Sequence, residues 1–113
     1  LGGLLDSVRL EPGAAGGRGV VWLEVPYSIT STVSPEDVES LVSSLRGVRE
    51  AAVSVLLKEY REGEWAVSLR SRGGVDVASV ASALGGGGHP AAAGCTVHGG
   101  VDSVVARLRD LLG

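Results

Sequence analysis

The sequence predicts an α/β fold in which a mixed five-stranded sheet is covered by about three helices. Segments with strand-like alternation are interleaved with segments whose apolar residues recur at helical spacing, in the order β-β-α-β-β-α-β-α. The 113 residues are 44% hydrophobic and contain no internal repeat. We therefore expect residues 1–113 to form one domain around a single core of Val, Leu, Ala and Ile.

The first third of the chain predicts a pair of strands. Residues 4–10 read as one strand, and residues 20–25, "VVWLEV", are rich in β-branched and aromatic residues. The Gly-rich stretch 11–19 between them is typical of a turn or loop. The two strands could then pair as a hairpin.

A helix is predicted to begin after the polar stretch "YSITSTVS". Ser34 is a favourable N-cap, Pro35 suits the first helical position, and the acidic residues that follow favour the positive end of the helix dipole. We expect this helix to end at Gly47 and to bury one face. That face carries Val38, Leu41, Val42 and Leu45.

Two further strands are predicted at residues 51–60 and 65–71, joined by the turn "REGE". The second strand alternates, so its two faces differ in character. Trp65, Val67 and Leu69 are expected to face the core, and Ala66, Ser68, Arg70 and Arg72 the opposite side.

The last third predicts two helices and a short strand. A run of four glycines follows the first helix, and residues 93–97 can form a strand after it. Residues 101–112 repeat apolar residues at helical spacing and predict a final amphipathic helix. Asp76 can cap the first helix, whose apolar residues are Val77, Val80, Ala81 and Leu84.

The composition limits the class of function. The net charge is −3 and the pI about 5.3, so no global basic field attracts long nucleic acid and any anion site is local. One cysteine fits a reducing compartment, and no apolar run reaches transmembrane length. We expect a cytoplasmic protein with no membrane partner. The chain begins at Leu1 and contains no Met, so we also expect a piece of a longer protein.

The stretch "GGGGHPAAAGC", residues 85–95, is unusual because it contains four consecutive glycines followed by a histidine. It is not a Walker A loop, and its formal match to G-x-G-x-x-A follows a helix and contains Pro90, which argues against a dinucleotide-binding turn. The first glycine can end the preceding helix, with the others forming a tolerated loop. We favour a functional interpretation, because successive backbone N–H groups can form an anion-binding nest and His89 adds a donor.

Arg70 and Arg72, at the end of a predicted strand, are candidates for the other half of an anion site. A guanidinium binds phosphate through two parallel hydrogen bonds and stacks on nucleobases. The alternative is that both are solvated surface residues. We favour function for Arg70 and leave both interpretations open for Arg72.

Residues 67–97, "VSLRSRGGVDVASVASALGGGGHPAAAGCTV", resemble the DHH-associated C-terminal domain of the DHH-family phosphoesterases. The "RS" element followed by "GGGGHPAAAG" is the specific part of the pattern. It is most similar to the bifunctional oligoribonuclease/PAP phosphatase type, and similar elements occur in RecJ-like exonucleases and cyclic-dinucleotide phosphodiesterases. The first half fits the same domain mainly by topology, so the resemblance spans essentially the whole chain.

The resemblance implies a substrate-binding domain. In that family an N-terminal DHH domain, absent from this chain, holds two Mn²⁺ or Mg²⁺ ions that activate water for hydrolysis. The expected substrate is a short 5′-phosphorylated oligoribonucleotide or 3′-phosphoadenosine 5′-phosphate (pAp). This chain alone is expected to hold no cofactor and to be inactive. The substrate-binding residues that the resemblance implies are Arg70, Ser71, Arg72, Gly85, Gly86, Gly87, Gly88 and His89.

Alternative functions stay open. The same domain could serve a RecJ-like single-strand exonuclease, a cyclic-dinucleotide phosphodiesterase or a polyphosphatase, or it could be a non-binding structural or dimerisation module. The acidic pI argues against a long DNA track, because polymer binders usually show a basic stripe. The expected partners are a short RNA or nucleotide and the N-terminal DHH domain, and a homodimer stays open.

Overall fold

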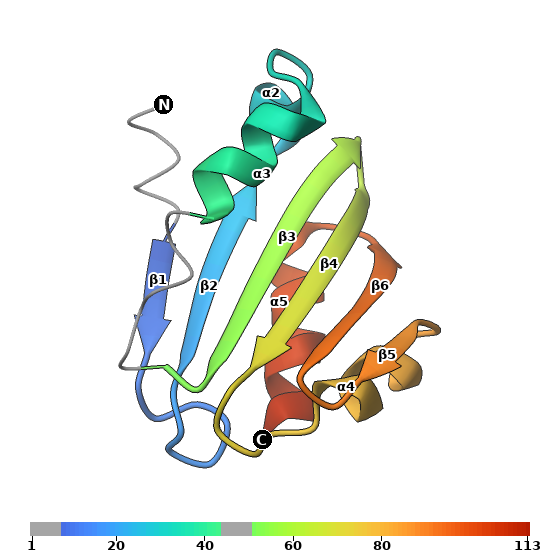
Figure 1. Ribbon diagram of the computed structural model, residues 1–113. Coiled ribbons are helices and arrows are strands. Elements are labelled where there is room, and N and C mark those ends of the chain that lie inside the picture. The colour runs from blue at the N-terminus through green and yellow to red at the C-terminus, as the bar shows by residue number, and fades with distance from the viewer. Residues whose placement is uncertain (1–7, 44–50) are drawn as a thin grey trace.

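The computed structural model describes residues 8–43 and 51–113. In this part a six-stranded sheet, with strand order β1-β2-β3-β4-β6-β5, carries helices on both faces (Figure 1). The predicted α/β class is confirmed, with one strand more than expected. The elements are β1 (Val8–Glu11), β2 (Val20–Val25), α2 (Tyr27–Thr30), α3 (Pro35–Ser43), β3 (Val53–Arg61), β4 (Glu64–Ser71), α4 (Val77–Ala83), β5 (Gly87–His89), β6 (Ala92–His98) and α5 (Val101–Leu112).

The sheet is mixed because β2 and β3 run parallel, while the other neighbouring pairs of the described sheet are antiparallel. β1 and β2 form the expected hairpin. A parallel pair needs a crossover connection, and α2 and α3 lie within it, on one face of the sheet (Figure 1). The short helix α2 falls in the segment that the sequence predicted as a polar loop.

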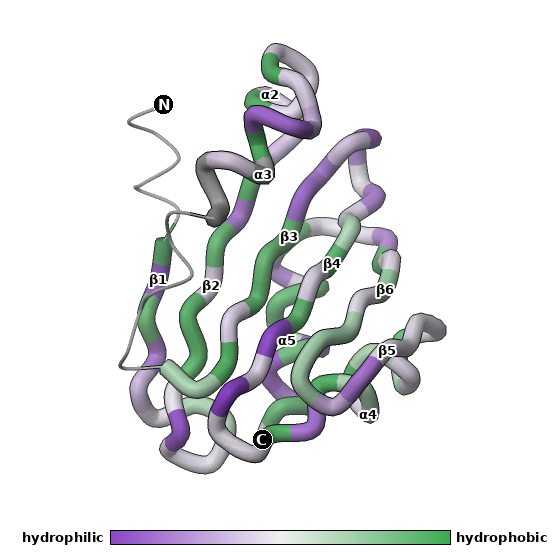
Figure 2. Tube along the Cα trace, in the orientation of Figure 1, coloured by the Kyte–Doolittle hydropathy of each residue, from purple (hydrophilic) through white to green (hydrophobic). Residues whose placement is uncertain are grey.

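The main core lies between the sheet and the helices α4 and α5. Alternation along the strands places every second side chain on this face, and Figure 2 shows hydrophobic stretches along β2 and β3. Trp22, Leu57 and Leu108 are fully buried, and burying a side chain of this size contributes about 1.5–3 kcal/mol. The predicted inward face of β4 is confirmed, because Trp65, Val67 and Leu69 are all buried.

A smaller cluster on the opposite face packs α3 against β2 and β3. Its buried members are Leu23, Val25, Val38 and Leu56. Val38 is buried as predicted, whereas the other predicted positions of that helix face, together with the stop at Gly47, lie outside the residues whose side chains are described. These positions are Leu41, Val42 and Leu45. The cluster does not extend over β4, β6 and β5, so no described helix covers this part of the sheet (Figure 1).

The Glu11 carboxylate joins the first hairpin to the last helix. Its Oε1 accepts hydrogen bonds from Trp22 Nε1 at 2.7 Å and Arg109 Nε at 3.2 Å, and its Oε2 accepts one from Arg109 Nη2 at 2.9 Å. The Arg109 guanidinium also lies 5.5 Å from the centroid of the Trp22 ring. The hydrogen bonds from Arg109, more than any other contact, lower the pKa of the Glu11 carboxyl below its ordinary value.

We predict that Glu11→Gln lowers the free energy of unfolding by about 1 kcal/mol at neutral pH, because the charge-assisted bonds are lost from a partly exposed site. This corresponds to a Tm lower by about 4 °C in thermal unfolding followed by circular dichroism. Since the pKa is lowered in the folded state, the stabilisation is present above pH 4.5 and is lost as the pH falls through the folded value. The difference between the two proteins should therefore shrink in acid.

Glu62→Gln is the matched control, since Glu62 is an exposed carboxylate in the turn between β3 and β4. It should leave the Tm within about 1 °C of the parent. Equal losses in the two variants would contradict a special role for Glu11.

Candidate functional site

The register of three strands places two predicted phosphate-binding side chains on one face of the sheet. Arg70 of β4 pairs with Ala92 of β6, and Ala92 pairs with His89 of β5. Residues opposite each other in neighbouring strands share a face, so these three form one row, which Ser54 of β3 continues. Two strand spacings separate the Cα atoms of Arg70 and His89 by about 10 Å.

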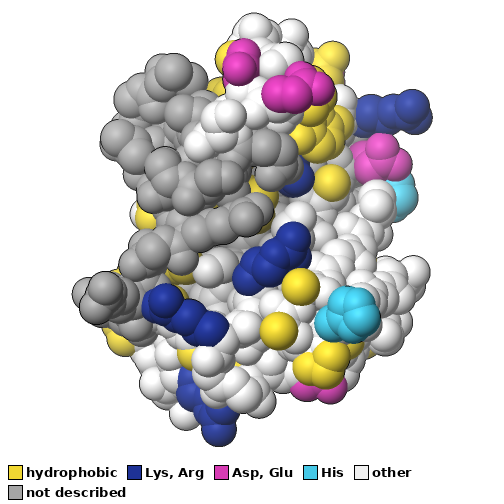
Figure 3. Space-filling view, in the orientation of Figure 1, with side chains coloured by type: hydrophobic (Ala, Val, Ile, Leu, Met, Phe, Trp, Pro, Cys, Tyr) yellow, Lys and Arg dark blue, Asp and Glu magenta, His cyan; other side chains and the backbone are white. Residues whose placement is uncertain are grey.

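We call this side of β4, β6 and β5 the open face. Ser68, Gly94 and Gly87 form the next row on it, and their small size leaves a flat floor beside the first row. Figure 3 shows a basic side chain and a histidine on this face, with small side chains between them. The residues of the open face are Ala66, Ser68, Arg70, Gly87, His89, Ala92, Gly94 and Thr96.

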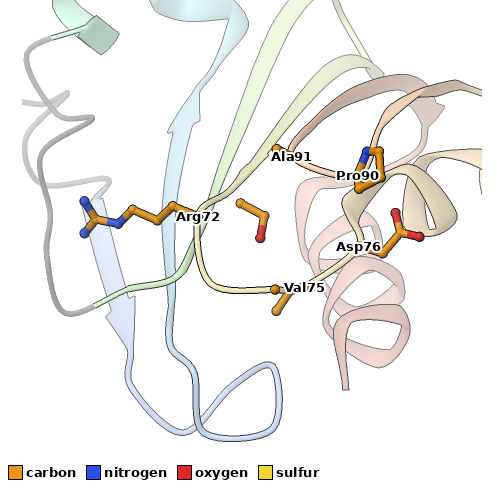
Figure 4. Close-up of a pocket in the computed structure, with 7 residues that line it drawn as sticks. Arg72, Val75, Asp76, Pro90 and Ala91 are labelled. Atoms are coloured by element: carbon orange, nitrogen blue, oxygen red, sulfur yellow. The ribbon is translucent and has the colours of Figure 1, made fainter.

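The three residues of the "RSR" element point in different directions. Arg70 is exposed, and its Nη1 donates to the carbonyl oxygen of Leu69 at 2.9 Å. Strand alternation directs the Ser71 side chain to the other face, and the Ser71 backbone N–H donates to Ala91 O at 3.0 Å. The Ser71 Oγ is buried and has no hydrogen-bond partner in the described residues. The Arg72 side chain extends away from Asp76 and Pro90 in Figure 4.

Two hollows adjoin this element at the end of β4. Ser71, Arg72 and Ala91 line both. The hollow in Figure 4 has a volume of about 310 Å³ and is lined by Ser71, Arg72, Gly74, Val75, Asp76, Pro90 and Ala91. The second, of about 240 Å³, is lined by Ala52, Ser54, Arg70, Ser71, Arg72 and Ala91.

The first half of the glycine run ends helix α4. Gly85 has φ +86, its N–H donates to Ser82 O at 3.1 Å, and the Gly86 N–H donates to Ala81 O at 2.8 Å. This pair of bonds is the Schellman motif, so the first glycine ends the helix, as in the alternative to the functional interpretation that we favoured. The bonds also occupy the N–H groups of Gly85 and Gly86, so the anion nest that the sequence suggested does not include them.

The second half of the run is strand β5, which the sequence did not predict. A Cβ on Gly86 would lie 2.1 Å from Gly94 O, and a Cβ on Gly88 would lie 2.6 Å from Ala92 O. Both positions therefore require glycine for the chain to approach β6 this closely. A Cβ on Gly87 would meet nothing within 4 Å. Gly87 is thus the glycine whose missing side chain leaves space above the open face.

Sequence reasoning missed two contributors to the site. Ser54 is a polar residue in the apolar first half of β3, on the same side of the sheet as Arg70, and the alternation of that strand could have identified it. Pro90 O accepts the N–H of Val77 at 3.0 Å, which ties the start of α4 to the turn between β5 and β6. Nothing in the sequence indicates this second contact, because it depends on a turn formed by the glycine run.

Residues 8–43 and 51–113 contain no group of three or more His, Cys, Asp or Glu side chains that could hold a metal ion. His98 Nε2 lies 3.1 Å from Glu64 Oε1 at the opposite end of β6 from the "RSR" element. Burial raises the pKa of the Cys95 thiol, which disfavours the thiolate needed for a nucleophile. In the described helices, no segment is long and apolar enough to cross a membrane.

A family model described as "DHHA1 domain" matches residues 20–113 of the chain. A curated relative, the bifunctional oligoribonuclease and PAP phosphatase NrnA of Thermus thermophilus, is 48% identical over 64 residues. The aligned segment is 57% of this chain and 19% of that protein. The family match covers all elements after the first hairpin strand, including the "RSR" element and the glycine run.

Solved structures share this fold at low sequence identity. An exopolyphosphatase-related protein from Bacteroides fragilis aligns with a TM-score of 0.78 over 98% of this chain, at 20% identity. The pGpG-specific phosphodiesterase PggH from Vibrio cholerae aligns with a TM-score of 0.60 over 96% of this chain, at 13% identity. The alignments cover 32% and 35% of those chains, so this chain spans about a third of their length.

The glycine geometry predicts opposite results for two neighbouring substitutions. Gly86→Ala should lower the free energy of unfolding by about 2 kcal/mol, because the added Cβ clashes with the backbone of β6. Gly87→Ala should change it by less than about 0.5 kcal/mol, because the added Cβ meets open space. Urea denaturation of both variants measures the difference. Equal stability of the two variants would show that β5 does not pack as described.

Proposed function

The chain belongs to the DHHA1 domain family, and on that premise we propose that it is the substrate-binding domain of a metal-dependent phosphoesterase. The substrate class we propose is a short 5′-phosphorylated oligoribonucleotide or pAp. The name of the Thermus relative, an oligoribonuclease and PAP phosphatase, supports this choice of substrate. The observation that carries the proposal is the row Arg70–Ala92–His89 on the open face, beside the hollows at the end of β4.

Arg70 and His89 bind the terminal phosphate in this proposal. A guanidinium binds phosphate bidentately, and a histidine adds a single directional donor. The two residues lie on the same row with Cα atoms about 10 Å apart, and Ala92 between them is too short to fill the gap. A phosphate placed above Ala92 is then within reach of both. This local site fits a chain whose net charge is −3, because it needs no general attraction for polyanions.

The flat floor beside this row accepts the sugar or base. Gly87, Gly94 and Ser68 carry no bulk above the sheet, so a planar ring can lie close to the backbone. Ser71 lines both hollows, and its hydroxyl is buried without a partner in the described residues, although buried polar groups usually have one. A ligand oxygen that reached this hydroxyl would supply that partner.

The described residues of this chain do not fit a catalytic metal pair, so we assign no step of the hydrolysis to them. The metal ions that the family implies, Mn²⁺ or Mg²⁺, would be held by the DHH domain of the longer protein to which this chain would belong. The contribution we propose for this chain is orientation, since it fixes the ligand so that its scissile phosphate is presented to the other domain.

We predict that Arg70→Gln and His89→Ala each weaken the binding of a 5′-phosphorylated diadenylate (pApA) by about tenfold. Each variant loses a charge-assisted or directional hydrogen bond to phosphate, and tenfold corresponds to about 1.4 kcal/mol. Isothermal titration calorimetry on this chain measures the affinities. Unphosphorylated ApA should bind more weakly than pApA to the parent chain and should be insensitive to both substitutions.

Arg61→Gln is the matched control, because Arg61 is an exposed arginine at the far end of β3, with 85% of its side chain accessible. It should leave the affinity for pApA within about twofold, a change worth less than 0.5 kcal/mol. If pApA does not bind at millimolar concentration, or if ApA binds as well as pApA, phosphate recognition by this domain is refuted. Affinity that climbs with oligonucleotide length would indicate an exonuclease instead.

We also predict that the chain supplied with Mn²⁺ releases no phosphate from pAp. The described residues offer no carboxylate and histidine cluster to bind a metal and activate water. A malachite-green assay for inorganic phosphate measures the release. Activity that survives repurification of the chain would contradict this prediction and assign chemistry to the domain itself.

A further inference from the structure

A third hollow continues the line of the two described above, at the same end of the sheet. Arg72 lines all three hollows, so they adjoin one another. The third has a volume of about 560 Å³ and is lined by Arg18, Ala51, Ala52, Arg72 and Gly73. Arg18 lies in the turn between β1 and β2, and neither the sequence pattern nor the proposed function makes use of it.

Backbone hydrogen bonds place Arg18 and Arg72 on either side of Ala52, two strand spacings apart. The N–H of Ala52 donates to Arg18 O at 3.0 Å, and the N–H of Arg72 donates to Ala52 O at 2.9 Å. These bonds extend the pairing of β2, β3 and β4 beyond the strand ends. The position of Arg18 relative to Arg72 is therefore set by the sheet, although Arg18 lies in a Gly-rich turn.

The Arg18 guanidinium is itself anchored on the turn after β4. Its Nη1 donates to Gly73 O. Gly74 has φ +83, and a Cβ at that position would lie 2.7 Å from the same Nη1, so the guanidinium uses space that another residue would fill. A guanidinium has five N–H donors in a planar fork, and this contact accounts for one of them. Anchoring lowers the entropy that an arginine loses when it binds an anion.

Three arginines thus adjoin one another at one end of a chain with a net charge of −3. Figure 3 shows basic side chains in succession over this end of the visible face. Arg70 and Arg72 are two residues apart along an extended segment, which separates their Cα atoms by about 7 Å. That separation resembles the spacing of successive phosphates along a nucleotide strand, so the arrangement suits an anion with more than one phosphate.

We propose that Arg18 and Arg72 form a second anion subsite, which binds the phosphate next to the one held by Arg70 and His89. This inference rests on the proposed function and extends it, because it selects ligands by the number of consecutive phosphates. The ligand chemistry is a series of phosphates, supplied by successive nucleotides of an oligoribonucleotide or by non-adjacent phosphates of inorganic polyphosphate, in which neighbouring phosphates share an oxygen and lie closer together. Arg18 contacts the ligand directly and is the residue that distinguishes two phosphates from one.

The test compares Arg18→Gln, Arg70→Gln and the control Arg61→Gln by isothermal titration calorimetry of this chain. The probes are pApA, AMP and inorganic tripolyphosphate. Arg18→Gln should weaken pApA binding by about five- to tenfold and leave AMP binding within about twofold, because AMP has no second phosphate. Arg70→Gln should weaken the binding of both pApA and AMP, and Arg61→Gln should weaken the binding of neither.

The parent chain provides a second readout that does not depend on the folding of a variant. In amide NMR titrations, pApA should shift the signals of Arg18 and Gly73, and AMP should not. If Arg18→Gln affects AMP and pApA equally, or affects neither, the second subsite is overturned. The same holds if pApA leaves the Arg18 and Gly73 signals unchanged.

These outcomes separate the subsite from the proposed function. If Arg70→Gln weakens the binding of both pApA and AMP and Arg18→Gln changes neither affinity, the subsite is refuted and the proposed function stands. Binding of tripolyphosphate that depends on Arg18, without binding of pApA or AMP, would support a phosphate-chain subsite and refute the nucleotide function. If none of the three probes binds the parent chain, both are refuted.

Discussion

The close approach of the glycine run to β6 is the constraint on which the open face depends. Side chains at Gly86 and Gly88 would overlap the β6 backbone, so only glycine lets β5 pair there. That pairing carries His89 into the row of Arg70. The same run closes α4, since the Gly86 N–H bonds back to the helix. The glycine run therefore fixes the position of His89. The entropic cost of ordering the glycines is offset by the β5–β6 pairing and by the helix end, neither of which another residue would permit.

The two faces of the sheet are covered unequally, and this asymmetry creates the site. α4 and α5 cover one face along β2, β3, β4 and β6, and its core is continuous. On the other face α3 covers β2 and β3, and the described helices do not reach β4, β6 and β5. An exposed sheet face usually carries varied polar side chains, but here Ser68, Gly87 and Gly94 leave it nearly bare. Small residues on a sheet face that no helix covers are expected where a bound molecule packs against that face.

Much of this arrangement follows from local patterns. Helical spacing and the Asp76 cap predict α4, whose first amides donate to the Asp76 carboxylate, and alternation predicts the buried face of β4. β5 could not be predicted, because a glycine run has low strand propensity and gains its structure from pairing with β6. Arg18 could not be identified either. Its neighbours in sequence are small turn residues, and its contact with Gly73 joins positions 55 residues apart.

The placement of charge argues for a short ligand. A protein that tracks a polymer spreads positive charge along a groove, whereas Arg18, Arg70 and Arg72 adjoin one another at one end of β4 within a chain of net charge −3. At physiological salt, screening limits exposed charges to a range of about 8 Å, so these arginines attract phosphates near them and little beyond. His89 marks the other side of the row at the edge strand of the sheet, where the open face ends. Under the proposed function, a ligand of a few phosphates would occupy this site.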